Sequence, residues 1–313
     1  MGRIGIAVLA AVYALAGTQA AVAETLTVSG WYAAEERSPS LLRSLAIDRF
    51  DGDDGPALVF EVERKLAASA GRDRKPYFEI RSLYAKVEGV VHGDVRTRID
   101  NVNFRRKAKR CPTDIYSTKC KDEVKIKVEL YCIRRTVTVS ANVQITRLSD
   151  DVRIYSRNLP QRDESESCEG ESRPTDVDNV IVTLVRRVAD EFAAQIIPFA
   201  RTEKIRVRET RSGMNKADSD QMKSLIAATK QSESAACAGW RDMESRGFSH
   251  PTLAYNLGVC AESVGDLDTA LRYYRSLAAS KNSSDANESI TRIERRLAGD
   301  EDDRLRNKTP SKL

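Results

Sequence analysis

Apolar and polar residues alternate along much of the first two thirds of the chain, which predicts a sheet of several strands. The longest run, residues 124–148, reads VKIKVELYCIRRTVTVSANVQITRL. Its apolar residues occupy even positions from Val124 to Cys132 and odd positions from Val137 to Ile145. Because alternate residues of a strand face opposite sides, this change of phase predicts a β-bulge or a strand break at 133–135.

A hairpin is predicted directly after this run, where LSDDV separates it from a second alternating stretch, VRIYSRNL. Pairing Arg147 with Val152, and Ile145 with Ile154, leaves a tight loop at Ser149–Asp150. Extending the same register backwards brings residue 132 within about two residues of residue 168.

Two amphipathic helices accompany the strands. One follows Pro56, with Leu58, Val62 and Leu66 in a stripe, and the other runs from residue 177 to Pro198. Short strands are expected before and after each helix. The fold class is therefore α+β, with an antiparallel or mixed sheet and two main helices, followed by an all-α domain with helical hairpins.

The domain organisation follows from these patterns and from two polar segments, TRSGMNKADSD and GDEDDRLRNKTPSKL. We expect a signal peptide at 1–23, an α+β domain at 24–209, a linker at 210–218, a helical domain at 219–299, and a disordered charged tail at 300–313.

The amino terminus predicts the compartment. An apolar stretch of 14 residues, Ile4–Gly17, follows Arg3, and small residues stand at Ala21 and Ala23. Such a stretch is shorter than the roughly 20 residues of a membrane span, so we expect a secretory signal cleaved after Ala23. The mature chain is then periplasmic or secreted, with no transmembrane segment.

Composition narrows the range of partners. Charged residues make up 31% of the 313 residues, but the formal net charge is only +5. A balance this close to neutral, together with the expected compartment, disfavours nucleic acid as a partner.

The cysteines are even in number, which makes disulfides the expectation in an oxidising compartment. They are Cys111, Cys120, Cys132, Cys168, Cys237 and Cys260. The first four allow three connectivities, of which local closure of the first two and the hairpin register of the next two favour Cys111–Cys120 and Cys132–Cys168. With only two histidines and no C-x-x-C, zinc ligation is disfavoured.

The stretch LAYNLGVCAESVGDLDTALRYYRSLAAS resembles a tetratricopeptide repeat. The residues that carry the resemblance are Leu257, Gly258, Gly265, Ala270 and Tyr274. Stepping back by the 34-residue period of such repeats gives a degenerate repeat at about 219–248. The resemblance implies that Cys237 and Cys260 lie on helices that pack together, either as a disulfide or as two buried thiols. It also implies a protein-binding face on the first helices, although a structural role is the alternative.

Residues 42–207 resemble the envelope domains of the TolB amino-terminal and curli-secretion-channel (CsgG) kind. The resemblance lies in RSLAIDRFDGDDGPALVFEVERKLAAS, in ANVQITRLSDDVRIYSRNL and in VADEFAAQIIPF. It implies a non-enzymatic adaptor or assembly role and supplies no catalytic residues. The chain departs from that pattern because it lacks a lipobox cysteine and has four cysteines within the strands.

A basic cluster stands in the strand section, at Arg105, Arg106, Lys107, Lys109 and Arg110. One interpretation is a surface for an anionic partner or polymer. The other is the solvated face of a sheet, since strand residues such as Lys125 and Lys127 simply alternate with apolar ones.

Catalytic and cofactor chemistry is not indicated. The acidic stretch DGDDGP at 51–56 fails the EF-hand pattern at its fifth, sixth and twelfth positions, so we interpret it as a turn before a helix. No catalytic, metal-binding or cofactor-binding residue is predicted. The sequence therefore favours a non-enzymatic interaction factor of the bacterial envelope that binds its partner through the helical module. The alternatives are an oligomeric ring or channel component of a secretion system, and a binder of anionic envelope polymers through the basic sheet.

Overall fold

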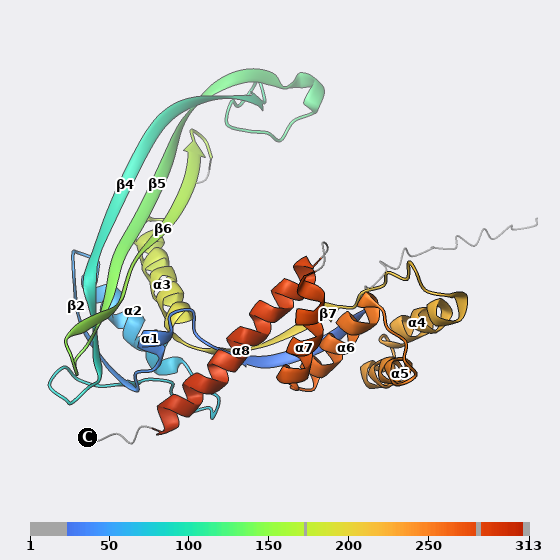
Figure 1. The fold of residues 1–313 in the computed structure, drawn as a ribbon. Coiled ribbons are helices and arrows are strands. Elements are labelled where there is room, and N and C mark those ends of the chain that lie inside the picture. Colours follow the sequence, from blue (N-terminus) through green and yellow to red (C-terminus); the bar gives the residue numbers. More distant parts are fainter. Residues whose placement is uncertain (1–23, 172–173, 280–282, 309–313) are drawn as a thin grey trace, which may run out of the picture. The chain divides into compact units, whose positions relative to one another are not determined.

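The computed structural model describes residues 24–171, 174–279 and 283–308 (Figure 1), so the predicted signal peptide lies outside the described residues. Within these ranges the chain divides into two compact units. Among the described residues, the α+β unit contains 29–202 and 288–308, and the helical unit contains 24–28 and 203–287. The predicted mixed α+β class is confirmed.

Three segments run from one unit into the other. They are strand β1 (Thr25–Tyr32), strand β7 (Phe199–Arg206) and helix α8 (Ser284–Lys308). β1 and β7 pair as a two-stranded sheet of their own. The helical unit therefore consists of two stretches of sequence far apart in the chain, which the expected boundary at 209–210 did not anticipate.

The α+β unit is built on a five-stranded mixed sheet in the order β3-β2-β4-β5-β6. The strands are β2 (Ser44–Asp51), β3 (Glu79–Ile80), β4 (Gly89–Arg110), β5 (Ile126–Arg147) and β6 (Val152–Cys168). β2 runs parallel to β3 and to β4, and β5 runs antiparallel to both of its neighbours, β4 and β6.

Two helices, α2 (Gly55–Ala68) and α3 (Val177–Ile196), cover the sheet beside the short strands (Figure 1). They were expected at these positions. A short helix, α1 (Arg37–Ser40), precedes β2. The main core forms where the helices meet the odd-numbered residues of β5, and it contains Leu58, Val62, Leu66, Val139, Val143, Leu184, Val188 and Phe192.

The acidic stretch 51–56 forms the turn between β2 and α2, as expected. Gly52 has a φ of +108°, and a Cβ atom there would lie 2.1 Å from the carbonyl oxygen of Val95. Only glycine fits this position, because a side chain would clash with the backbone of β4. Asp54 precedes the helix and accepts a hydrogen bond from the Thr97 hydroxyl.

The distal halves of β4 and β5 continue beyond the helices as a long curved hairpin (Figure 1). We call residues 96–136, together with residues 161–171 of β6 and the turn after it, the arm. A loop with one 3₁₀ turn, Asp122–Val124, closes the hairpin.

The predicted bulge at 133–135 is wrong, because β4 and β5 pair in one unbroken register from Gly89–Arg147 to Arg110–Ile126. The strand instead changes the face that it buries. Near the helices Val137 and Val139 face the main core, whereas in the arm Leu130 and Cys132 face the opposite side and form a second small core with Cys168. A change of apolar phase therefore marked two cores on opposite faces of one strand.

A bulge does occur, but beside the β5–β6 turn. Arg147 pairs with Val152 as predicted, whereas Ile145 pairs with Tyr155 in place of Ile154, because Ile154 is an extra residue in β6. This single inserted residue shifts all later pairs by one and places Cys132 directly opposite Cys168.

The three expected disulfides, Cys111–Cys120, Cys132–Cys168 and Cys237–Cys260, are all present. The first closes the loop at the end of the arm. The second bridges β5 and β6 with Cα atoms 4.0 Å apart. The third joins two helices of the helical unit.

The helical unit contains α4 (Lys216–Ala228), α5 (Glu233–Ser245), α6 (Pro251–Ser263) and α7 (Leu267–Ala278). α4 begins within the expected linker at 210–218. Gly258 of α6 lies against Tyr274 of α7, where an added Cβ would be 2.7 Å from the tyrosine ring. Leu257 and Ala270 are buried, and Gly265 has a φ of +83° between the two helices.

The expected tail at 300–313 is not disordered as far as the description reaches, because residues 300–308 continue α8. From residue 288 this helix packs on the α+β unit, not on the expected helical domain at 219–299. The Arg306 guanidinium donates to the carbonyl oxygens of Ser40 and Tyr77 at 2.7 and 2.6 Å and covers the Tyr77 ring. The Asp302 carboxylate, nearly fully buried, accepts from Arg37 at 3.0 Å. The charged composition that suggested disorder supplies these contacts.

We expect loss of the Cys132–Cys168 bridge to destabilise the arm more than loss of Cys111–Cys120. The bridged positions are 36 and 9 residues apart, so the loop entropies released on replacing both cysteines by serine correspond to about 4 and about 2.5 kcal/mol. Hydrogen exchange of arm amides in the two double-serine variants measures the difference. Equal protection in both variants and in the parent would contradict it.

Candidate functional site

The segment between β7 and α4 lies along α6 of the helical unit. We call residues 207–212 the strap. Its first residue, Val207, is buried, and the Val207 amide donates to the Glu24 carbonyl oxygen at 3.0 Å. The residues that follow contact α4, α6 and the first turn of α8 through polar groups.

Side chains on one face of α6 hold the strap by its backbone. The Asn256 carboxamide is fully buried, accepts from the Arg208 amide at 2.8 Å and donates to the Arg208 carbonyl oxygen at 3.1 Å. One turn earlier, the Thr252 hydroxyl donates to the Thr210 carbonyl oxygen at 2.5 Å. Residues four apart share a helix face, so the two side chains form a row along the strap.

The strap continues past the start of α6. The His250 ring lies with Nε2 3.0 Å from the Ser212 carbonyl oxygen, while its Nδ1 accepts from the Thr252 amide at 3.1 Å. A neutral ring with its proton on Nε2 satisfies both contacts. Arg211 adds a contact at 3.5 Å to the Ser219 carbonyl oxygen of α4.

The Arg208 side chain has its own site. Its Nε donates to the Asp285 carboxylate at 2.7 Å, and its guanidinium lies 4.6 Å from the centre of the Tyr255 ring. The hydrogen bond to Asp285 raises the pKa of the guanidinium against the effect of burial. Burial acts to raise the pKa of Asp285, but the hydrogen bond and charge of Arg208 outweigh it and lower that pKa below its ordinary value.

The strap-holding residues were missed by the sequence analysis. We call Thr252, Tyr255, Asn256 and Asp285 the strap face. The motif residues Leu257 and Gly258 were singled out, but Gly258 faces α7 and serves helix packing. The available signal was the buried polar Asn256 in an otherwise apolar helix stretch, LAYNLGVC, because a buried carboxamide requires hydrogen-bond partners.

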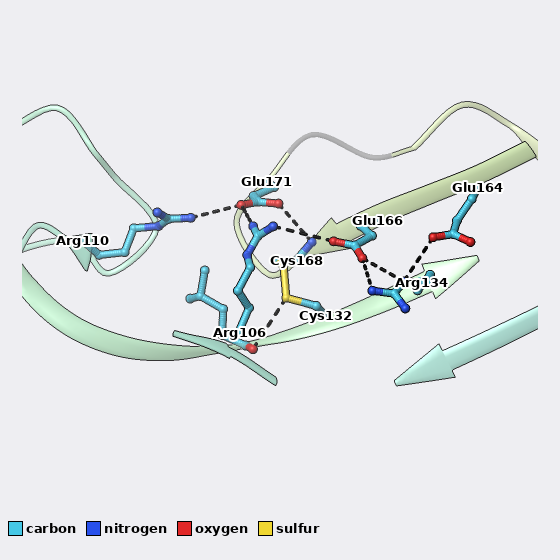
Figure 2. A network of polar contacts seen from close by, with 9 residues as sticks. Arg106, Arg110, Cys132, Arg134, Glu164, Glu166, Cys168 and Glu171 are labelled. Atoms are coloured by element: carbon cyan, nitrogen blue, oxygen red, sulfur yellow. Dashed lines mark hydrogen bonds and ion pairs between the residues drawn. A yellow bond between two sulfur atoms is a disulfide. The ribbon is translucent and has the colours of Figure 1, made fainter. Parts of the chain in front are cut away.

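The structure divides the predicted basic cluster between the two faces of the arm. Arg106 and Arg110 point to one face, where both contact Glu171 beside the Cys132–Cys168 bridge (Figure 2). Arg134 joins the same network through Glu164 at 3.4 Å and Glu166 at 2.6 Å. Through these ion pairs the arginines link β4 and β5 to β6 and the turn after it.

The remaining cluster residues alternate with these along β4 and so lie on the other face. Arg105 lies 3.6 Å from Glu129 and covers the Tyr131 ring, and Lys107 and Lys109 are exposed. A cavity of about 790 Å³ beside the end of β6 is lined by Arg105, Tyr131, Ile133, Ser167 and Glu169, among others.

Within the ranges that the structure describes, no three His, Cys, Asp or Glu side chains are grouped as a metal site requires. In the same ranges, no helix is both long and apolar enough to span a membrane.

Comparisons with known proteins give distant similarity to solved structures. No protein-family model matches the chain, and no curated protein matches it. Among solved structures, the chain is similar to the dodecamer of a PelC point variant from Paraburkholderia phytofirmans, at 12% identity, covering 56% of this chain and 99% of that chain with a TM-score of 0.24. At this identity and TM-score the similarity identifies neither a family nor a function.

The Arg208–Asp285 pair makes the hold on the strap dependent on pH. Because the folded-state pKa of Asp285 is lowered, its contribution is complete at neutral pH and is lost as the pH falls through that pKa, below about 4. We expect Asp285→Asn to weaken protection of the Arg208 amide from hydrogen exchange at pH 7 by up to about 1 kcal/mol. The difference from the parent should shrink as the pH falls below the ordinary aspartate pKa of about 4 and through the lowered pKa of Asp285.

The matched control is Asp220→Asn, which removes an exposed carboxylate from α4 and should leave the Arg208 amide unchanged. A deficit of Asp285→Asn that does not shrink as the pH is lowered until Asp285 is protonated would mean that the carboxylate charge does not hold the strap.

Proposed function

We propose that this chain is a non-enzymatic periplasmic protein that binds other proteins during assembly or regulation of the bacterial envelope, and that the strap face is its partner site. The observation that carries the proposal is the way in which this face holds an extended peptide segment. Asn256 binds both backbone polar groups of one residue, and Tyr255 with Asp285 receives a basic side chain.

The compartment is supported independently. Three disulfides pair all six cysteines of the chain, and disulfides form and persist in oxidising compartments such as the periplasm. The resemblance of the helix pair to tetratricopeptide repeats, and of residues 42–207 to TolB and CsgG domains, belongs to the proposal as a sequence-based prediction.

The strap defines the chemistry of the partner. A segment that takes its place presents extended backbone and a basic side chain where Arg208 now lies. The strap competes from the same chain at an effective concentration in the millimolar range, so a partner must bind the face more tightly than the strap does. Partner binding and release of the strap are thereby coupled.

A peptide with the sequence of residues 204–213, KIRVRETRSG, tests whether this face accepts a segment in trans. We expect it to bind the full-length mature chain weakly and to bind the Arg208→Ala chain at least tenfold more tightly, because the weakened strap competes less. Fluorescence anisotropy of the labelled peptide measures both affinities. The same peptide with alanine in place of Arg208 is the matched control and should bind less well to either chain.

Absence of saturable peptide binding to the Arg208→Ala chain would contradict the proposal and would mean that the strap face serves only to hold the strap within the fold. Binding of the control peptide equal to that of KIRVRETRSG would contradict the assignment of Tyr255 and Asp285 as a site for a basic side chain.

A second candidate function, an oligomeric ring or channel component, is favoured by the two open edges of the arm. Among the described residues, β4 pairs with no strand on its outer side beyond Asp94, and β6 has no neighbour on its outer side. The open part of β4 is strongly basic. The distal part of β6 and its turn is acidic, with Asp163 and Glu169 beside Glu164, Glu166 and Glu171, which are paired with arginines of the same arm. Complementary edges of one chain can pair head to tail with further copies.

In that case light scattering should give the mature chain a mass several times that of one copy. Reversing charge at the β4 edge with Lys107→Glu and Lys109→Glu should reduce it to one copy, because like charges would face each other across the edges. A strictly monomeric parent chain excludes this function.

A further inference from the structure

The end of the arm presents apolar side chains to solvent. We call residues 105–131 the arm tip. Within it, four side chains are between 43% and 51% exposed, namely Ile115, Tyr116, Val124 and Ile126. These four residues lie between positions 115 and 126. The first three are in the loop that closes the hairpin, and Ile126 is the first residue of β5.

The loop holds two of them in a fixed turn. The Cys111–Cys120 bridge closes the loop, and within it the Cys111 amide donates to the Ser117 carbonyl oxygen at 3.0 Å. The Asp114 carboxylate accepts from the Tyr116 amide at 3.0 Å. Ile115 and Tyr116 therefore occupy the central positions of a stapled turn, with one side of Tyr116 packed against Gly170 and about half of the side chain exposed. Such a turn loses little conformational entropy on binding.

Exposed lysines flank these apolar residues along the sequence. The arm tip contains nine basic and four acidic residues, an excess of five, which equals the formal net charge of the whole chain. Among the described residues, five of its lysines are exposed and form no ion pair: Lys107, Lys109, Lys119, Lys121 and Lys127. In contrast, Arg106, Arg110 and Lys125 are already paired with carboxylates.

We propose that the arm tip docks on the surface of an anionic phospholipid membrane, with Ile115 and Tyr116 entering the headgroup layer and the lysines adjoining lipid phosphates. Short apolar and aromatic side chains next to lysines are the combination that an anionic bilayer surface selects. A soluble anionic polymer would engage the lysines but would gain nothing from Ile115 or Tyr116. The proposal does not depend on the strap face.

Sedimentation with vesicles tests the proposal on the full mature chain with its disulfides intact. We expect the chain to bind vesicles of phosphatidylcholine with 30% phosphatidylglycerol and not vesicles of phosphatidylcholine alone. Lys119→Gln with Lys121→Gln should lower the partition coefficient about 25-fold, since each lysine near such a surface contributes about fivefold. The matched control, Lys216→Gln with Lys223→Gln in α4, removes the same charge outside the arm and should change it less than twofold.

The apolar residues decide between a membrane and a charged polymer. Ile115→Ser with Tyr116→Ser should lower vesicle binding at least tenfold and leave binding to dextran sulfate unchanged. Vesicle binding unaffected by this pair, or dextran sulfate binding without vesicle binding, would overturn the membrane assignment in favour of a polymer. No binding to either, or equal binding to neutral and anionic vesicles, would also overturn it.

Discussion

The register between β4 and β5 determines the structure of the α+β unit beyond its helices. β4 and β5 stay paired over 22 residues without a shift, so every side chain of the hairpin has a fixed face from the core to the arm tip. The inserted Ile154 then fixes the register of β6 and with it the position of Cys168. A slip of one residue would reverse the faces, placing Leu130 in solvent and separating the two cysteines.

The helical unit meets a different constraint, because it must accommodate the backbone of the strap beside its helices. A chain without strand partners leaves its amides and carbonyls unsatisfied, and burial of such groups is costly. Asn256 and Thr252 supply those partners from helix side chains. The same side chains that make the strap stable are those that any extended segment would need, so structure and proposed function rest on one set of contacts.

Much of the architecture followed from local pattern. Helix positions and the β5–β6 turn depend on periodicity and register, which can be read from the sequence. The pairing of Cys237 with Cys260 was implied by the resemblance to tetratricopeptide repeats. The bulge at Ile154 was missed, although the adjacent apolar residues Ile154 and Tyr155 interrupt the alternation at this point. The helical state of residues 300–308 was also missed. The partners of Arg306 and Asp302 are Ser40, Tyr77 and Arg37, more than 200 positions away, and only tertiary contact makes that charged segment ordered.

The discontinuous helical unit has a consequence for the order in which the chain folds. Residues 24–28 belong to that unit, where Glu24 pairs with Lys230 at 3.0 Å and Thr27 bonds to Glu233 at 2.8 and 2.9 Å. A chain synthesised from its amino end presents these residues first and their partners only after some 200 more. The β4–β5 hairpin of the arm and its Cys111–Cys120 disulfide can form in the interval, before the first strand acquires its partners. Residues 24–28 are thus among the last parts of the chain to reach their native contacts.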